Sequence, residues 1–274
     1  MEKIIISSNL TQYRLIETLD RVTYYTSSFL YHHKGQGVLI DSGYGRLGQF
    51  IKDDLEQSKI ILNAIVITHY HKDHAEGSTV FNEIPIIASD QYEDTFYKCQ
   101  NVCTQQLKIP NVLVKDKYFL TVDTSRIEIF KTPGHTKCGL SVLINNEYLY
   151  VSDNLLEDIN NKIIVPYLDA SSNPYDHYKT IYNYQNLKFH TLLLTHGPIK
   201  ENVNLTHEFG ERLFYLETFI KSKFSCNIED CLLTNIENYS MTAIHKINVR
   251  NAKKHVSIQP TSFFEPMECI TKEI

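Results

Sequence analysis

The sequence predicts an α/β protein in which two β-sheets are packed between helices, and two observations carry this prediction. Short β-rich runs alternate with helical patterns from Met1 to about His196, and no linker rich in Pro, Gly or Ser interrupts them. Several runs, such as 64–68 and 192–195, are continuously apolar, which is typical of strands covered on both faces. We therefore expect a first domain over about residues 1–200.

The individual elements follow from the same patterns. The expected strands are bounded by turn-forming or charged residues and cover residues 3–8, 22–31, 37–41, 62–68, 84–89, 127–132, 140–144, 148–152 and 191–195. The expected helices between them cover residues 47–57, 91–100 and 176–187. From Asn204 the pattern changes, because large apolar residues recur at helical spacing at positions 205, 209, 213, 216 and 220. We expect a mainly helical C-terminal extension, residues 201–274, packed on the first domain.

Composition and charge exclude several functional classes. The net charge is −5, and Lys and Arg are spread along the chain, so no basic patch is expected for nucleic acid or for an anionic membrane. No stretch approaches the roughly 20 apolar residues of a spanning helix, and the first ten residues do not resemble a secretion signal. We expect a cytoplasmic protein with a small-molecule substrate, and we expect its six cysteines to be reduced packing residues.

The most informative segment, residues 68–74, reads Thr-His-Tyr-His-Lys-Asp-His and directly follows a buried strand. It holds potential metal ligands at four positions within six residues. Such close spacing lets His69 and His71 point to one side of a cavity while Asp73 and His74 reach the other side. One loop can thus supply ligands to two metal sites. A polar surface loop would explain a single histidine, but it does not explain this cluster at the end of an apolar strand.

Later strands end in further side chains that can bind a metal. His135 follows the run 127–132 in a turn formed by Pro and Gly, and Asp153 and His196 come directly after apolar runs. Alone, each would more simply be a turn former or a structural residue. Their joint occurrence, each at the end of a buried strand, favours a metal centre.

Seven residues together resemble the metal-ligand pattern of the metallo-β-lactamase superfamily: His69, His71, Asp73, His74, His135, Asp153 and His196. The resemblance covers roughly residues 20–200 and implies a four-layer αββα sandwich with the metals at one edge of its sheets. It also implies one metal held by positions 69, 71 and 135, a second held by positions 73, 74 and 196, and a bridging aspartate at position 153. Asp41 resembles the early aspartate of the family, which supports the histidine loop from behind.

Departures and matches within the family narrow the expected function. His71 stands where the flavodiiron branch usually has an acidic residue, which disfavours an oxygen-reducing iron centre. Asp153 is present, whereas the true β-lactamase branches lack an equivalent bridging carboxylate, which disfavours antibiotic hydrolysis. The resemblance points to hydrolases of small carbonyl substrates: glyoxalase II-like thioesterases, acyl-homoserine-lactone lactonases and the quinolone-signal-associated thioesterases with C-terminal helices.

These ligands imply two divalent metal ions as cofactors. Imidazole and carboxylate ligands fit zinc, and iron or manganese also suit the mixed second site. Two metals sharing a water would lower its pKa from about 15.7 towards about 7, and the resulting hydroxide would attack a small thioester, ester or lactone. Asp73 is the candidate catalytic residue, which would orient this hydroxide and pass a proton to the leaving group.

Substrate contacts are less closely defined by the sequence. Tyr167 and Tyr175 are candidates for a phenol that binds the substrate, although a half-buried ring is the commoner role of tyrosine. Residues 91–117 and the tail from Asn204 are candidates for the pocket wall, with core packing as the simpler explanation of their aromatic residues. The C-terminal helices would form either a lid or a homodimer face. Two other functions stay open: a small-molecule phosphodiesterase, and a regulatory or binding protein that retains the metal site.

Overall fold

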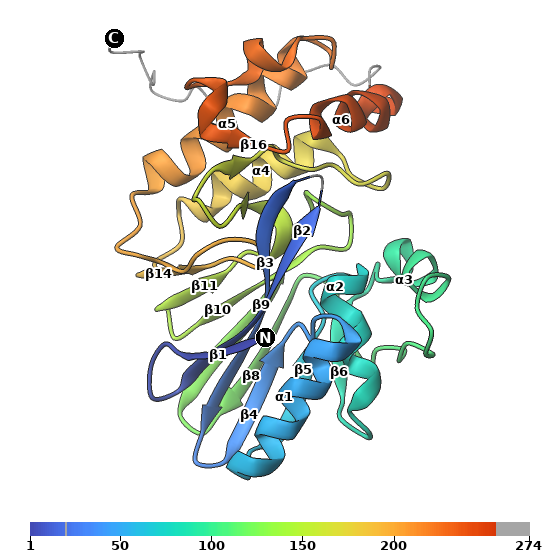
Figure 1. Ribbon diagram of the computed structural model, residues 1–274, viewed down its shortest axis with the longest axis vertical. Helices are drawn as coiled ribbons and strands as arrows, with labels where there is room; N and C mark the ends of the chain where they lie inside the picture. Colours follow the sequence, from blue (N-terminus) through green and yellow to red (C-terminus); the bar gives the residue numbers. More distant parts are fainter. Residues whose placement is uncertain (20, 256–274) are drawn as a thin grey trace.

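The computed structural model describes residues 1–19 and 21–255, and two β-sheets form its centre (Figure 1). The first is a seven-stranded sheet with the order β1-β2-β3-β4-β5-β6-β7. Its strands are β1 (Glu2–Ile5), β2 (Leu10–Leu19), β3 (Val22–His33), β4 (Gln36–Ile40), β5 (Ile61–Val66), β6 (Ile86–Ser89) and β7 (Val112–Val114). Strands β1 to β4 are antiparallel neighbours, whereas β4, β5, β6 and β7 run parallel.

The second sheet has six strands in the order β15-β14-β11-β10-β9-β8. Its strands are β8 (Lys117–Val122), β9 (Ser125–Lys131), β10 (Leu140–Ile144), β11 (Tyr148–Tyr150), β14 (Thr191–Leu193) and β15 (Lys200–Glu201). Strands β11 and β14 are parallel neighbours, so the residues that follow them leave the sheet at the same edge. The same holds for β4 and β5 in the first sheet. This shared geometry lets residues from distant parts of the chain meet.

Three apolar cores hold four layers together. The core between the sheets joins residues of the first sheet, such as Phe29 and Val66, to residues of the second, such as Ile129 and Val142. The outer face of the first sheet packs against α1 (Gly45–Ser58) and α3 (Glu93–Gln100). The outer face of the second sheet packs against α4 (Pro174–Tyr184) and α5 (Leu205–Lys221). The predicted four-layer αββα class is therefore confirmed.

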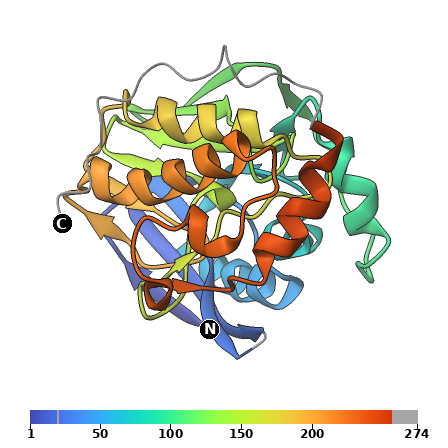
Figure 2. The same ribbon diagram turned by 90° about the horizontal axis from the view of Figure 1, so that it is seen from above.

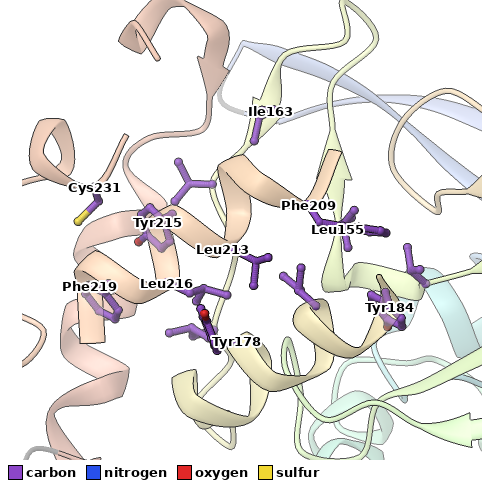
Figure 3. Close-up of a cluster of buried hydrophobic side chains, with 14 of the residues drawn as sticks. Leu155, Ile163, Tyr178, Tyr184, Phe209, Leu213, Tyr215, Leu216, Phe219 and Cys231 are labelled. Atoms are coloured by element: carbon purple, nitrogen blue, oxygen red, sulfur yellow. The ribbon is translucent and has the colours of Figure 1, made fainter. Parts of the chain in front are cut away.

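The C-terminal extension is helical only in part. Helix α5 runs beside α4, and residues of both helices interdigitate in one buried cluster, among them Tyr178 and Tyr184 of α4 and Phe209, Leu213 and Leu216 of α5 (Figures 2 and 3). A short sheet of β12 (Leu156–Glu157), β13 (Ile163–Ile164) and β16 (Tyr239–Ser240) then leads into α6 (Ile244–Ala252). The segment between α5 and β16 holds only the short 3-10 turns Ile228–Cys231 and Ile236–Asn238. Residues 256–274 of the expected extension lie outside the described residues.

Most expected strands and helices coincide with observed ones, but the longer strands β2 and β8 and the short strands β7, β12, β13, β15 and β16 were not predicted. Strand β2 buries polar side chains, and one of them, Gln12, donates a hydrogen bond to the hydroxyl of Ser27 at 2.9 Å. Its apolar and polar residues therefore do not alternate as a strand pattern requires. No helix among the described residues is long and apolar enough to cross a bilayer. The expected cytoplasmic location stays a prediction.

Candidate metal centre

The histidine loop leaves the first sheet at the end of β5. His69 and His71 follow the strand directly, and the short helix α2 (Lys72–Ala75) then carries Asp73 and His74 to the other side of the same space. The side chains of His69 and His74 are almost completely buried. The change from extended backbone at His71 to helix at Lys72 therefore divides one loop between two groups of ligand atoms.

The three later residues come from the second sheet and meet this loop. His135 follows β9, Asp153 lies in the turn after β11, and His196 follows β14. Two compact groups of potential ligand atoms result, each with its atoms within 4.8 Å of one another: His69, His71, His135 and Asp153 in one group, and Asp73, His74 and His196 in the other. The structure thus brings all seven residues of the predicted ligand set to one edge of the two sheets.

The carboxylate of Asp153 lies between the two groups. Its Oδ2 atom is 3.5 Å from Nε2 of His135 and 3.8 Å from Nε2 of His69. Its Oδ1 atom is 3.2 Å from Nε2 of His74 and 3.7 Å from Nε2 of His196. Each oxygen therefore faces one group, which is the geometry that a bridging carboxylate needs.

Several of these atoms are buried without a hydrogen-bond partner among the described residues. They are Nε2 of His69, Nε2 of His74 and Oδ1 of Asp153. Burying a polar atom without a partner costs free energy, so such a concentration of unpaired atoms at one point calls for a ligand. Nitrogen and carboxylate oxygen atoms are the donors that zinc and related first-row metals bind, so the residues present fit a divalent metal centre.

The electrostatics of the centre fit the same ions. Burial lowers the pKa of His69 well below its usual value and that of His71 to about 4, so both rings are neutral and can donate a lone pair. On the other side, burial opposes the charging of His74, but the carboxylates of Asp153, Asp41 and Asp73 outweigh it and raise the pKa of His74 well above the usual value. This side of the centre therefore concentrates negative charge that a divalent cation would neutralise.

Asp41 fixes the orientation of the loop from behind, as the resemblance implied. Its Oδ2 atom lies 2.8 Å from Nδ1 of His74 and accepts hydrogen bonds from the hydroxyls of Thr68, at 2.8 Å, and Tyr150, at 2.6 Å. Its Oδ1 atom accepts from the backbone N–H of Thr68 at 2.8 Å. Nδ1 of His74 is thereby fixed as the protonated nitrogen, which leaves Nε2 free to bind a metal.

Backbone carbonyls orient two other rings in the same way. Nδ1 of His135 donates to the carbonyl oxygen of Tyr167 at 3.0 Å, and Nδ1 of His196 donates to that of Tyr25 at 2.6 Å. In both rings the other nitrogen, Nε2, faces the carboxylate of Asp153. Protein hydrogen bonds therefore set the tautomer that metal binding requires.

Sequence reasoning missed the residues that hold the Pro-Gly turn before His135. The amide of Asn154 accepts from the backbone N–H of His135 at 3.1 Å and donates to the carbonyl of Thr132 at 3.1 Å. His177, on α4, donates to the carbonyl of Asn154 at 3.1 Å. Asn154 directly follows a predicted ligand, which was the available signal, whereas nothing near His177 in the sequence points to this contact.

A cavity of about 540 Å³ opens onto the metal-ligand residues. Tyr167 lines it, as expected for a residue that contacts substrate, and so does Tyr24, which the sequence reasoning did not single out. Tyr175 lies elsewhere: its ring is buried in the helical core and packs edge-on against Phe224. Tyr175 is therefore not placed to contact a substrate. Its apolar ring and its position on the inner face of α4 explain its burial without one.

The expected pocket wall is found in part, because the tail from Asn204 lines the cavity but residues 91–117 do not. Phe96 packs behind the first sheet, and Phe209 and Tyr215 of α5 belong to the core on the second sheet. The described lining includes none of residues 91–117. The C-terminal extension contributes a different segment, Met241 to Ile247, at the start of α6.

A third group of potential ligands lies in the C-terminal extension and comprises Cys226, Cys231 and His245. One ring nitrogen of His245 donates to the carbonyl of Cys226 at 3.0 Å, and the other lies 2.9 Å from the hydroxyl of Tyr215. Both nitrogens therefore have protein partners. In contrast to the centre around Asp153, this group is complete without an ion.

Comparisons with known proteins find similar sequences and similar folds. Residues 21–96 match the model of the metallo-beta-lactamase superfamily. A hydroxyacylglutathione hydrolase of Actinobacillus pleuropneumoniae is 29% identical over 101 residues, which are 37% of this chain and 39% of that protein. A hydroxyacylglutathione hydrolase of Haemophilus ducreyi is 27% identical over 146 residues, 49% of this chain and 58% of that protein. The chain thus spans less than two thirds of the length of these relatives.

Solved structures extend the likeness of fold over more of the chain. A metallo-beta-lactamase from Pontibacter korlensis superposes with a TM-score of 0.62 and covers 77% of this chain and 98% of its own, at 20% identity. An αββα sandwich with two groups of histidine and carboxylate ligands at one edge of its sheets defines a class of metal-binding proteins. The fold of this chain is thus similar to that of a metallo-beta-lactamase, and its residues 21–96 match the superfamily model.

Proposed function

We propose that the chain is a dinuclear metal-dependent hydrolase that cleaves a small thioester, ester or lactone. The observation that supports this proposal most directly is the position of Asp153, which turns one carboxylate oxygen toward each group of ligand atoms. The names of the curated relatives support a thioester, since both are hydroxyacylglutathione hydrolases. The metals we propose are zinc, with iron or manganese as the alternatives for the mixed site.

Two bound divalent ions would supply a water of lowered pKa and Lewis acid polarisation of a carbonyl. The residues of the chain complete this chemistry. The side chain of Asp73 is 20% exposed, lines the cavity and has its Oδ2 atom 3.2 Å from Nε2 of His196. We assign to Asp73 the orientation of the attacking water and the transfer of its proton to the leaving group.

Tyr24 would add a neutral hydrogen-bond donor beside Asp73. Its ring lies edge-on to His196, with 5.1 Å between ring centroids, and it lines the cavity. Burial, together with the carboxylates of Glu17, Asp73 and Asp153, raises the pKa of Tyr24 to about 12, so the phenol keeps its proton at neutral pH. Such a donor can stabilise the negative charge that develops on a carbonyl or leaving oxygen.

Elemental analysis combined with a hydrolysis panel tests the proposal. The panel comprises a thioester, an aryl ester, a lactone, a phosphodiester and a β-lactam, each assayed with the metal-loaded protein and after chelation. The variant His69→Ala removes a buried ligand atom, and His207→Ala is its matched control, because the side chain of His207 is 70% exposed on α5. We expect about two metals per chain, turnover of carbonyl substrates, and loss of both in the first variant alone.

Two results would overturn parts of the proposal separately. Turnover confined to the phosphodiester would exclude the carbonyl substrate class and leave the metal centre intact. Full turnover by the chelated protein, or by His69→Ala, would exclude metal-dependent hydrolysis itself.

A further inference from the structure

The walls of the cavity above the metal centre are almost entirely apolar outside the ligand residues. Its lining includes Leu19 and Val22 of the β2–β3 hairpin, and Leu156 and Ile164 of the small sheet. The C-terminal extension closes the remaining side with Met241, Thr242, Ala243, Ile244 and Ile247. A cavity of about 540 Å³ with such walls has the size and character of a small-molecule site.

The wall formed by the extension is fixed to the metal centre. Strand β16 pairs with β13 and holds the chain just before Met241. One turn beyond Ile244, the buried amide of Asn248 accepts from the backbone N–H of Leu168 at 2.9 Å and donates to the carbonyl of Pro166 at 2.6 Å. The backbone carbonyl of Tyr167, in the same loop, orients His135. The start of α6 is therefore held in place as part of the cavity wall.

Among the described residues that line this cavity there is neither lysine nor arginine. Glutathione carries two carboxylates, and burying a carboxylate without a cationic or hydrogen-bonding partner is costly. Outside the candidate ligands, the described lining offers such a group only neutral hydroxyls, those of Tyr24, Tyr167 and Thr242. Burial raises the pKa of Tyr167, and Arg250, exposed on α6, lies close enough to oppose that rise. Arg250 is not among the residues that line the cavity.

Resting on the proposed function, we infer that the substrate is an acyl compound whose parts inside the cavity are uncharged and mainly apolar, and that it is not a glutathione thioester. Glutathione, the thiol that the name of the curated relatives contains, is therefore not the thiol of this chain's substrate. The acyl group lies against Ile244 and Ile247, and its burial there favours longer apolar acyl groups over shorter ones. Each methylene group of the acyl chain that is buried against the apolar wall raises kcat/KM by about fourfold until the cavity is filled.

A matched pair of thioesters tests this inference. The same acyl group is joined either to glutathione or to N-acetylcysteamine, a neutral thiol, and the acyl chain is lengthened from two to eight carbons. With the zinc-loaded protein we expect kcat/KM for the neutral series to exceed that for the glutathione series at least tenfold and to rise with chain length. Equal or faster turnover of the glutathione series would overturn the inference. Failure to hydrolyse either series would instead count against the proposed function.

Variants of the wall sharpen the test. Ile247→Arg introduces the missing cation, so we expect turnover of the glutathione thioester to rise relative to the neutral one. Ile247→Ser removes an apolar side chain from the wall and is expected to flatten the dependence of kcat/KM on chain length. Arg250→Ala is the control and is expected to leave the selectivity unchanged. Loss of glutathione thioester turnover in Arg250→Ala would show that a cation outside the cavity wall recognises this thiol, and it would overturn the inference.

Discussion

The Oδ2 atom of Asp41 lies 2.8 Å from Nδ1 of His74, and both side chains are completely buried. Asp41 stands after β4 in a left-handed backbone conformation, with φ of 53°, and His74 lies 33 residues further along the chain. The parallel pairing of β4 with β5 brings the two together. A second-layer contact of this kind sets which nitrogen of His74 is available to a metal.

Replacing Asp41 by Asn tests this contact. The amide keeps the size of the carboxylate but removes its charge, so His74 becomes a weaker ligand. We expect metal affinity at the site of His74 and His196 to fall 10- to 100-fold, measured by competition with a chelator of known affinity. Unchanged affinity at both sites would show that Asp41 serves folding alone. Asp54→Asn is a suitable control, because Asp54 lies on α1 and pairs with Lys3, which is not a candidate ligand.

Gly134 is required by close packing behind His135. A Cβ atom at this position would lie 2.3 Å from Oδ1 of Asn154 and 2.6 Å from Cδ2 of His177. Gly134→Ala must therefore displace Asn154 from the backbone N–H of His135. We expect weaker binding at the site of His69, His71 and His135 and a lower Tm. Gly45→Ala, where the nearest atom would be at 3.7 Å in ordinary contact, should change neither quantity.

His177 makes stability depend on pH. Burial lowers the pKa of His177 from 6.5 to about 3, so as pH falls the unfolded chain takes up the proton first. The stability contribution is complete above pH 6.5 and is lost as pH falls toward 3, at about 1.4 kcal/mol per pH unit. Between pH 7 and pH 5 the wild type should lose about 2 kcal/mol more than His177→Gln, which cannot titrate. Urea unfolding at the two pH values measures this difference, and parallel losses would refute the assignment.

Asn248 secures the C-terminal extension. Besides its two hydrogen bonds to the loop 166–168, it donates to the hydroxyl of Tyr215 at 2.9 Å. Asn248→Leu leaves these buried groups unpaired, and we expect it to lower the free energy of unfolding by about 2 to 4 kcal/mol. Asn251→Leu is a milder comparison, because Asn251 is only partly buried and makes one such bond, to the carbonyl of Leu168. An equal effect of both changes would contradict the anchoring role.

Tyr24→Phe removes the proposed neutral donor without changing the ring that packs against His196. We expect kcat to fall by about tenfold to a hundredfold, with metal content unchanged, since one hydrogen bond to developing charge is lost. The comparison is Tyr44→Phe, a second phenol whose pKa is raised chiefly by burial and then by Asp73, but which does not line the cavity. If both variants lose activity equally, the effect belongs to packing around Asp73.

The convergence of the seven candidate ligands could be predicted from the sequence because the signal is local. Each of His69, His135 and Asp153 comes directly after a strand, and strand ends that leave one edge of a sandwich must lie near each other. The fold class followed for the same reason, since continuously apolar runs mark strands covered on both faces.

What the sequence could not predict depends on contacts between distant segments. Strand β2 was missed because Gln12 is buried and satisfied by Ser27, across a strand pair that only the fold creates. Asn248 and the wall at Ile244 and Ile247 were missed because β16 pairs with β13, 76 residues earlier in the chain, and this pairing leaves no local pattern. Tyr175 was misplaced because a tyrosine in a helical core and one in a pocket have the same local sequence. A homodimer through the C-terminal helices stays a prediction.

The central claim is that Asp153 bridges two metal ions held by the two ligand groups. Anomalous diffraction at the zinc edge from crystals grown with zinc tests it most directly. We expect two peaks about 3.5 to 4 Å apart, one on each side of the Asp153 carboxylate. A single peak, or peaks away from Asp153, would contradict the account.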